Sequence, residues 1–322
     1  MKAWLIDDQN GIDGIRLGDA PDPSPKPGQV VIQLEFAALN PADYYLAAGQ
    51  YPARPAMPHV LGRDGIGTVA AVGDGVGDIK VGDQRLLLRG EAGVTEPGTL
   101  AELVAVPADR TVKPPVGWSK EQAAAAPLVY MTAHQAIKQW GDLPAKATVL
   151  VTGATGGVGV ACIQLAKAWG HTVVGLSRSA EKRDELLKLG ADHALDAEVD
   201  GLAKRIGDAA GKIDLCVDNV GGPGFSEVVT AMGERGRISV VGMLAGPVPS
   251  FNTAKLLFRR IRVGGVVVGS YDPSEAAAAW EEIVAAGVDP QVDSVHPFAD
   301  VPRAFARLKA GPMGKVVVRV AE

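Results

Sequence analysis

The chain has 322 residues, of which 47% are hydrophobic and 21% charged, and its 32 Lys+Arg against 37 Asp+Glu leave a formal net charge of -5. This length allows about two domains with a sizeable core, and the composition excludes intrinsic disorder, a collagen-like fibre and an obvious polyanion-binding surface. The two cysteines, Cys162 and Cys216, are too few for a disulfide framework or a multi-cysteine zinc site. The N-terminus turns acidic at Asp7 and Asp8, and no apolar run approaches the ~18–20 residues of a membrane span, so we expect a cytoplasmic protein.

The first third of the sequence is strand-like. Short runs of β-branched, partly alternating residues recur, and glycine, proline or aspartate bounds each run. No long helical pattern separates them, so we expect a compact, mostly β domain over residues 1–120. The runs that predict its strands are 30–36, 67–73, 85–88 and 100–106.

The pattern changes near residue 120. Ser119 is a suitable N-cap for an alanine-rich helix that we expect to reach about Trp140. From residue 148 strands and helices alternate, which indicates an α/β domain over residues 121–269 with a doubly wound parallel sheet, and the segment 270–322 then completes the first domain. The expected strands are 148–152, 172–176, 213–218, 237–241 and 315–320, and the expected helices are 157–169, 181–189, 274–286 and 301–309.

A glycine-rich turn follows the first of these strands and opens a helix. Such a turn lets the backbone approach a pyrophosphate, whose charge lies at the free N–H groups and positive dipole end of the helix. Ala154, Gly156 and Gly159 fill the three small-residue positions of the dinucleotide fingerprint, with alanine in place of the first glycine. We therefore predict dinucleotide binding rather than a purely structural turn. The predicted contact residues are Ala154, Thr155, Gly156, Gly157, Val158 and Gly159.

The end of the second strand predicts which dinucleotide binds. NAD sites place a carboxylate about 20 residues after the turn, where it accepts bonds from the ribose 2′-hydroxyl. This chain instead has Ser177 and Arg178, with no carboxylate before Glu181, and Lys182 follows closely. A hydroxyl and two cations suit a 2′-phosphate, so we predict NADPH. The alternative is that the two cations only solvate the start of a helix.

Two further strand ends contribute candidate coenzyme residues. The strands at 213–218 and 237–241 run directly into short polar or glycine-containing segments. Ligands of open parallel sheets bind at this carboxyl edge. We therefore expect the nicotinamide ribose to be lined by Asn219, Val220 and Gly242, with Met243 beside them in the coenzyme site.

Short-chain and medium-chain dehydrogenases both have a glycine turn of this kind. Short-chain members use a Tyr-x-x-x-Lys pair, and none of the five tyrosines here has a lysine at that spacing. A β-rich segment precedes the central dinucleotide domain, and four motifs lie along the chain: Asn40-Pro41-Ala42-Asp43, Gly62-Arg63-Asp64-Gly65, Val81-Gly82-Asp83-Gln84-Arg85 and Thr132-Ala133-His134. With these motifs the sequence resembles the medium-chain dehydrogenase/reductase superfamily over nearly the whole chain, and within it the zinc-free NADPH:quinone oxidoreductase branch.

The resemblance implies a GroES-like catalytic domain, a Rossmann NADP-binding domain and a substrate pocket against the nicotinamide. Asn40, Tyr45 and Tyr51 match residues that contact substrate: an amide can donate to a carbonyl oxygen, and a tyrosine supplies an apolar wall and a proton donor. Turn formation by Asn40 and packing by the tyrosines are the alternatives. Thr132 matches a position that faces the nicotinamide, and Lys315 either reaches the coenzyme or is a surface charge.

The β-branched run 261–268 is a candidate edge strand. An exposed sheet edge invites pairing with a second chain. Members of the family that this sequence resembles commonly dimerise through such a strand. We therefore expect a homodimer, with an edge covered by the chain's own loops as the alternative.

No metal site is expected. A catalytic zinc needs three protein ligands, usually Cys and His, whereas this chain has Asn40 and Arg63 where the zinc-dependent members have Cys and His. Its five histidines show no metal-ligand spacing; we expect His59 in a loop and His134 as a packed or capping residue of its helix. Without a Lewis acid, an activated, conjugated acceptor fits better than a simple alcohol.

These observations predict an NADPH-dependent reductase that passes hydride to a quinone or another conjugated carbonyl, after which water can supply the proton. An enoyl-thioester reductase of the enoyl-CoA or acrylyl-CoA type is the first alternative, because a basic patch can hold its phosphates. A non-catalytic NADPH-binding protein is the second. The acidic balance predicts no nucleic-acid partner, and no membrane partner is expected. The residues available for a basic patch are Arg54, Arg63, Arg85 and Arg89.

Overall fold

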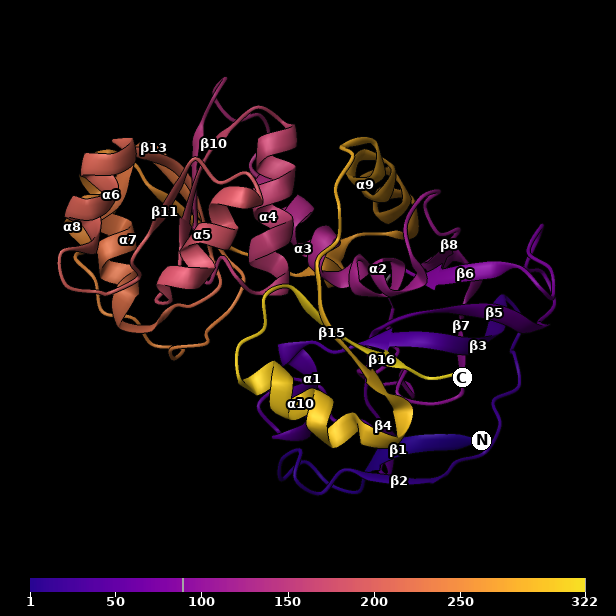
Figure 1. Cartoon of the computed structure of the whole chain (residues 1–322). Coiled ribbons are helices and arrows are strands. Elements are labelled where there is room, and N and C mark those ends of the chain that lie inside the picture. Colours follow the sequence, from indigo (N-terminus) through magenta and orange to yellow (C-terminus); the bar gives the residue numbers. More distant parts are fainter. Residues whose placement is uncertain (89, 322) are drawn as a thin grey trace. The chain divides into compact units, whose positions relative to one another are not determined.

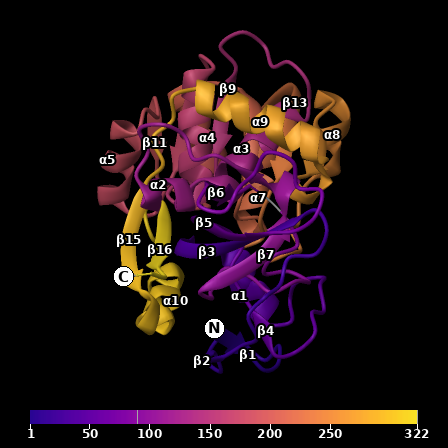
Figure 2. The same ribbon diagram turned by 90° about the vertical axis from the view of Figure 1, so that its right-hand side faces the viewer.

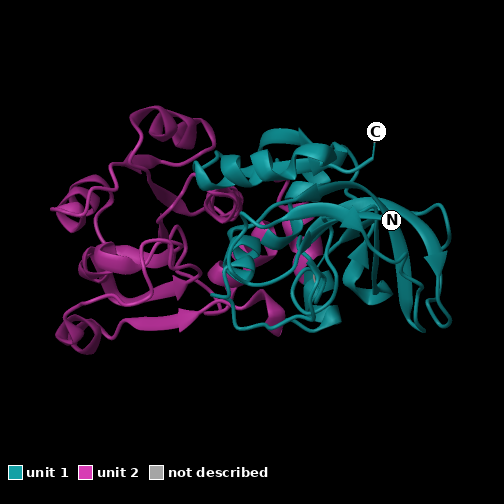
Figure 3. Ribbon diagram, turned by 90° about the horizontal axis from the view of Figure 1, so that it is seen from below, with its two compact units in different colours: residues 1–128, 271–278, 289–322 teal, residues 129–270, 279–288 magenta. Residues whose placement is uncertain are grey.

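The structure is a computed structural model that describes residues 1–88 and 90–321. The chain divides into two compact units (Figure 3). The first contains Met1–Leu128, Tyr271–Ala278 and Asp289–Glu322, and the second contains Val129–Ser270 and Ala279–Val288. The first unit thus extends beyond residue 120, and part of the C-terminal segment lies in the second unit.

The first unit is built on a seven-stranded sheet in the order β15-β16-β3-β5-β6-β8, with β7 paired to β3 outside this path. All of its pairings are antiparallel except that of β15 with β16. The alternating residues Val30, Ile32 and Leu34 of β3 are buried in a shared core, which confirms the mostly β character expected from the sequence. The strands are β3 (Gln29–Ala38), β5 (Asp64–Val72), β6 (Gln84–Leu87), β7 (Leu103–Pro107), β8 (Thr111–Val112), β15 (Val292–Pro297) and β16 (Lys315–Arg319).

A smaller sheet of order β2-β1-β4 completes the first unit. Its core is shared with helices, because Trp4, Leu46 and Phe305 belong to one buried apolar cluster. Figure 2 shows α10 beside β15 and β16. The bounds are β1 (Lys2–Ile6), β2 (Arg16–Asp19), β4 (His59–Val60), α1 (Pro41–Ala47), α2 (Lys120–Ala125), α10 (Val301–Lys309), and the short 3-10 helices η1 (Ala108–Arg110) and η4 (Phe298–Asp300).

The second unit contains a six-stranded sheet in the order β11-β10-β9-β12-β13-β14, and all five pairings are parallel. Numbered along the chain, this is the 3-2-1-4-5-6 order of the Rossmann fold, which confirms the predicted doubly wound sheet. The strand order reverses between β9 and β12, so the carboxyl ends of these two strands form the switch point at which such sheets bind ligands. The strands are β9 (Thr148–Val151), β10 (Thr172–Leu176), β11 (His193–Leu195), β12 (Ile213–Asp218), β13 (Met232–Val240) and β14 (Arg262–Gly265).

Helices cover this sheet (Figure 1). Leu202 of α6, Val228 of α7 and Leu256 of α8 pack on one apolar cluster with strand residues such as Leu150 and Ile238. Helix α9 (Pro273–Ala285) contributes residues to both units. The other helices are α3 (Pro127–Lys138), α4 (Gly157–Ala168), α5 (Ala180–Lys188), α6 (Leu202–Ala210), α7 (Phe225–Ala231), α8 (Thr253–Arg259), η2 (Gly222–Gly224) and η3 (Val268–Ser270).

The expectation of one helix from Ser119 to about Trp140 is wrong. The segment forms two helices, α2 and α3, separated at Ala126. Pro127 explains the break, because it has no N–H to donate to the preceding turn; Ala126 itself keeps helical backbone angles (φ -87°, ψ -44°). The predicted cap is confirmed: Ser119 Oγ accepts the N–H of Gln122 (3.2 Å).

The run at 261–268 contains β14, which ends the strand order of the second unit's sheet, so the edge position is confirmed. Val263 on this strand is 43% exposed, and Leu257 and Phe258 on the preceding helix are 71% and 81% exposed. Association of two chains along this edge stays a prediction. No helix among residues 1–88 and 90–321 is both long and apolar enough to cross a membrane.

Candidate functional site

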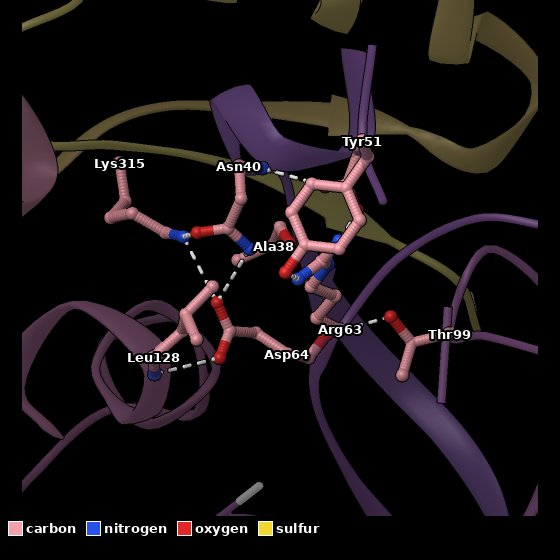
Figure 4. Close-up of polar contacts among 9 residues, drawn as sticks. Ala38, Asn40, Tyr51, Arg63, Asp64, Thr99, Leu128 and Lys315 are labelled. Atoms are coloured by element: carbon pink, nitrogen blue, oxygen red, sulfur yellow. Dashed lines mark hydrogen bonds and ion pairs between the residues drawn. The ribbon is translucent and has the colours of Figure 1, made fainter. Parts of the chain in front are cut away.

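Three neighbouring strands of the first unit bring polar side chains to one end of its sheet. β3 lies between β16 and β5, and Ala38 at its end is paired with Asp64, while Val317 pairs with Ala38 from the other side. Asn40 lies two residues after Ala38, Asp64 begins β5 and Lys315 begins β16. Strand register therefore brings these three polar side chains together from distant parts of the sequence (Figure 4).

Asn40, Asp64 and Lys315 form a buried hydrogen-bonded cluster. Their exposed fractions are 2%, 1% and 4%. Lys315 Nζ donates to Asn40 Oδ1 (2.5 Å) and to Asp64 Oδ2 (3.0 Å), and Asn40 Nδ2 donates to Asp64 Oδ2 (2.9 Å). The backbone N–H of Leu128 donates to Asp64 Oδ1 (2.9 Å). A buried ammonium and a buried carboxylate thus compensate each other and fix the amide beside them.

This cluster bears on two predicted site residues. The Asn40 amide nitrogen already donates to Asp64 and, over 3.4 Å, to the carbonyl of Ala38. Donation from Asn40 to a substrate oxygen stays a prediction, and it requires the exchange of one of these bonds. The alternative that Lys315 is a surface charge is wrong, because the residue is buried. Coenzyme contact by Lys315 stays a prediction, since its ammonium bonds to Asn40 and Asp64.

Arg63 lies against Tyr51 and next to Asp43. Arg63 Nη1 donates to Tyr51 Oη (3.2 Å), and the guanidinium carbon lies 4.5 Å from the centre of the tyrosine ring (Figure 4). Arg63 Nε is 3.7 Å from Asp43 Oδ1. These two atoms and Arg63 Nη2 are buried without a hydrogen-bond partner among the described residues. Because a guanidinium only donates, the Tyr51 oxygen accepts this bond and its own hydrogen remains available for donation.

Burial controls the charge of Asp43. The residue is fully buried in the first turn of α1, where its Oδ2 accepts the backbone N–H of Asn40 (2.8 Å). Removal from water raises the pKa of the Asp43 carboxyl to about 6, although the positive charge of Arg63 and the Asn40 bond oppose the rise. Asp43 therefore titrates close to neutral pH in the folded chain.

Three further residues with a predicted place or role are Tyr45, His59 and His134. Tyr45 is half-buried on α1, and substrate contact by it stays a prediction. The expectation that His59 lies in a loop is wrong: it lies buried in β4, where desolvation lowers its pKa to about 4. His134 is packed as expected, with Nε2 3.1 Å from Glu282 Oε2 and its ring edge-on to Trp169.

Three of the four arginines that are available for a basic patch lie among the described residues. Arg54 is exposed, but it donates to backbone carbonyls including that of Tyr51 (2.6 Å). The side chains of Arg63 and Arg85 are only 10% and 11% exposed. Arg89 lies outside the described residues. Two of the four arginines are therefore too buried to offer an open surface to phosphates.

The residues present do not fit a zinc ion. Within the part of the chain that the structure describes, no three or more His, Cys, Asp or Glu residues are grouped as metal ligands. Cys162 and Cys216 are buried in the second unit, and burial raises the pKa of both thiols, which disfavours the thiolate that zinc requires. Zinc independence stays a prediction, to be tested by elemental analysis.

The predicted phosphate turn has no room for a side chain at Gly159 but is open at Gly156. An added Cβ at Gly159 would lie 2.5 Å from the carbonyl oxygen of Gly153, whereas one at Gly156 would meet only that oxygen, at 3.6 Å. Gly156 is the N-cap of α4, and it makes no side-chain cap hydrogen bond. The first N–H groups of a helix have no intrahelical acceptor, so this open turn fits the pyrophosphate of a dinucleotide.

Asp218 ties the two strands of the switch point together. Its Oδ1 accepts the hydroxyl of Thr152 (2.6 Å), which follows β9, and its Oδ2 accepts the N–H of Gly221 (3.1 Å). Asn219 Nδ2 in turn donates to the carbonyl of Thr152 (2.8 Å). A Cβ at Gly242 would lie 2.5 Å from the Asn219 carbonyl oxygen, so glycine is required there. The predicted residues Asn219, Val220 and Gly242 are therefore gathered at one sheet edge.

The predicted 2′-phosphate residues lie where β10 meets α5. Ser177 is buried, and its Oγ accepts the N–H of Ser179 (3.3 Å), the N-cap of α5. Arg178 is exposed, and Lys182 is half-buried in the first turn of α5. Thr132 is half-buried on α3, and Met243 is 41% exposed after β13. Coenzyme contact by all of these residues stays a prediction.

Sequence reasoning assigned no site role to Asp43, Asp64 or Asp218. Two of them had a signal: Asn40 and Asp43 have the spacing of a capping box, and Asp218 ends a buried strand. Asp64 lies in the motif Gly62-Arg63-Asp64-Gly65, but nothing local indicated its pairing, because its partner Lys315 lies 251 positions away.

Two family models match the chain: "Alcohol dehydrogenase GroES-like domain" over residues 26–116 and "Zinc-binding dehydrogenase" over residues 157–285. The chain is 30% identical to a quinone oxidoreductase of Lama guanicoe, over 99% of this chain and 97% of that protein. It is 33% identical to an acryloyl-coenzyme A reductase of Sulfurisphaera tokodaii, over 75% of this chain and 77% of that protein. A mycobacterial protein solved in complex with NADPH is 30% identical, with a TM-score of 0.89 and coverage of 99% of this chain and 100% of that chain.

Asp43→Asn should change how stability depends on pH. The variant keeps an oxygen for the Asn40 N–H but cannot ionise. In the wild type the unfolded carboxyl loses its proton near pH 4 and the folded one near pH 6, so this group lowers the free energy of unfolding as pH rises between those values. Denaturant unfolding from pH 4 to 7 should show the wild type losing stability relative to Asp43→Asn up to about pH 6, and no further. Asp13→Asn, at an exposed position, serves as the control; a flat difference between wild type and Asp43→Asn would contradict the assignment.

Gly159→Ala should weaken NADPH binding by at least about tenfold, or ~1.4 kcal/mol, because the new Cβ forces the turn apart. Gly207→Ala is the matched control, since its Cβ meets no atom within 4 Å on α6. The control should keep wild-type affinity and gain about 0.5–1 kcal/mol of stability. Coenzyme fluorescence titration and thermal unfolding measure both effects, and unchanged affinity in Gly159→Ala would exclude this turn as the phosphate site.

Proposed function

We propose that the chain uses NADPH to reduce a quinone or another conjugated carbonyl. It belongs to the medium-chain dehydrogenase/reductase family, in its quinone oxidoreductase branch, and is an oxidoreductase. The observation that carries the proposal is the glycine turn at the switch point of the parallel sheet, followed one strand later by Ser177 and Arg178 in place of an acidic residue.

On the coenzyme side, the turn from Ala154 to Gly159 would hold the pyrophosphate, and Asn219, Val220 and Gly242 would line the nicotinamide ribose. Bound NADPH supplies a hydride. Ser177, Arg178 and Lys182 would hold the 2′-phosphate, since a hydroxyl and two cations favour a dianion that a carboxylate would repel. Support for this coenzyme comes from the mycobacterial relative whose structure contains NADPH.

On the substrate side, Tyr51 is the best candidate to contact the carbonyl oxygen. Its hydroxyl accepts from Arg63 and so can direct its hydrogen to a substrate oxygen on which negative charge develops. Asn40 and Tyr45 are the further candidates. The lack of a fit to zinc among the described residues favours an acceptor that spreads the incoming charge by conjugation.

Reduction of an α,β-unsaturated thioester is the second candidate function. The similarity to an acryloyl-coenzyme A reductase favours it. The burial of Arg63 and Arg85 counts against an open basic patch for the phosphates of such a substrate.

A steady-state panel of quinones, enones and enoyl-CoA esters with NADPH distinguishes these functions. We expect saturable oxidation of NADPH with quinones or enones. Saturable turnover of enoyl-CoA with inert quinones would establish the second candidate instead. NADPH binding without oxidation by any acceptor would indicate a non-catalytic binding protein.

Arg178→Ala should raise the KM for NADPH about tenfold, taking ~1.4 kcal/mol for an exposed, charge-assisted contact. The KM for NADH should barely change, because NADH has no 2′-phosphate. Lys182→Ala should also raise the KM for NADPH, but less strongly, since an ammonium cannot make the two parallel hydrogen bonds of a guanidinium. Added salt should reduce the preference of the wild type for NADPH over NADH, because salt screens an exposed charge contact. Lys204→Ala, which removes an exposed cation from α6, is the control. Equal use of both coenzymes by the wild type would refute the phosphate assignment.

A further inference from the structure

Arg183 holds the backbone of the turn that carries the predicted 2′-phosphate residues. It lies one turn into α5, whose N-cap is Ser179. Arg183 Nη1 donates to the carbonyl oxygen of Ser177 (2.9 Å) and to that of Arg178 (3.2 Å). The same nitrogen is 3.1 Å from Asp196 Oδ2, just after the edge strand β11. One guanidinium thus bonds to both residues of the turn and to the neighbouring strand end.

The direction of this side chain follows from helix geometry. Side chains on an α-helix point back toward its N-terminus, so an arginine in the second turn can reach the segment before the N-cap. The Arg183 side chain is 22% exposed, and Asp196 fixes it from the other side. A planar guanidinium presents its donors in a fixed arrangement, which a flexible ammonium does not.

The two carbonyls held by Arg183 determine how the turn presents its side chains. Ser177 Oγ already accepts the N–H of Ser179, so the hydroxyl is fixed from its own side of the turn. Arg178 is exposed and takes its direction from the backbone that carries it. A preorganised turn avoids the ordering cost that a mobile one incurs when it binds a ligand.

We infer that Arg183 is a positioning residue for coenzyme choice: it holds the carbonyls of Ser177 and Arg178 so that their side chains are preorganised for the 2′-phosphate of NADPH. The inference rests on the proposed function, since it requires that this turn bind the phosphate. Arg183 acts by holding the backbone of the turn, so a positive charge at this position is not by itself sufficient for the preference for NADPH.

The test is the dissociation constants of NADPH and NADH, measured by coenzyme fluorescence without any substrate. Arg183→Gln should raise the constant for NADPH about fivefold, the size of one or two lost hydrogen bonds, and leave that for NADH within about twofold. Arg183→Lys keeps the charge but not the fixed arrangement of donors, so it should lose most of the NADPH preference as well. Lys188→Gln removes an exposed cation of the same helix that pairs with Glu185, and should leave both constants unchanged.

The double variant Arg183→Gln with Asp196→Asn removes the carboxylate that would otherwise lose its partner. The NADPH preference should stay low in this variant. Its return to the wild-type value would overturn the inference, because repulsion by Asp196 would then explain the effect. Full preference in Arg183→Lys, or equal weakening of both coenzymes in Arg183→Gln, would also overturn it.

Arg178→Ala separates this inference from the proposed function. If the wild type prefers NADPH and Arg178→Ala removes that preference while Arg183→Gln keeps it, only the role of Arg183 is wrong. If the wild type has no preference and Arg178→Ala changes nothing, the phosphate site itself is wrong and the role of Arg183 falls with it.

Discussion

The candidate coenzyme site depends on the close approach of the carboxyl ends of two parallel strands, β9 and β12. β9 and β12 are neighbours at the point where the strand order reverses. Asp218 bonds to the Thr152 hydroxyl and to the N–H of Gly221, so the carboxylate joins both strand ends and the following loop. Gly159 and Gly242 lie where any Cβ would collide with backbone. These local requirements bring the strand ends and the glycine turn together at one edge of the sheet, and the strand order makes this edge the place where such folds bind a dinucleotide.

The first unit buries charged side chains within a mostly β domain. Lys315 and Asp64 compensate each other and hold Asn40 between them, so this cluster is fully bonded. The pair of Arg63 and Asp43 is looser, with 3.7 Å between the nearest atoms, and burial raises the pKa of Asp43 to about 6. The tight cluster fixes the ends of three strands, whereas Arg63 of the loose pair lies against Tyr51, whose contact with substrate stays a prediction.

Local sequence patterns predicted much of this arrangement. The parallel sheet, the glycine turn and the strand ends at Asn219 and Gly242 follow from alternation and spacing within short windows. The break at Pro127 could also be read locally, since proline interrupts the helix that the surrounding alanines favour. The partners of Lys315 could not, because 275 residues separate it from Asn40 and only strand register brings them together. The hydrogen bonds from Arg183 to the carbonyls of Ser177 and Arg178 could not be predicted either, because they depend on side-chain direction, which residue spacing alone does not specify.

The central claim is that this fold carries hydride from NADPH to a conjugated acceptor, a quinone or another conjugated carbonyl. NADPH deuterated at C4 of the nicotinamide, on each face in turn, tests it most directly when the reduced product is analysed by mass spectrometry and NMR. With an enone, the account predicts that one of the two labelled coenzymes transfers one deuterium to a carbon of the product. With a quinone, deuterium delivered to oxygen exchanges with water and is not retained. In both cases one coenzyme should be oxidised for each acceptor reduced. An enone product without deuterium from either coenzyme, or coenzyme oxidation that does not depend on the acceptor, would contradict it.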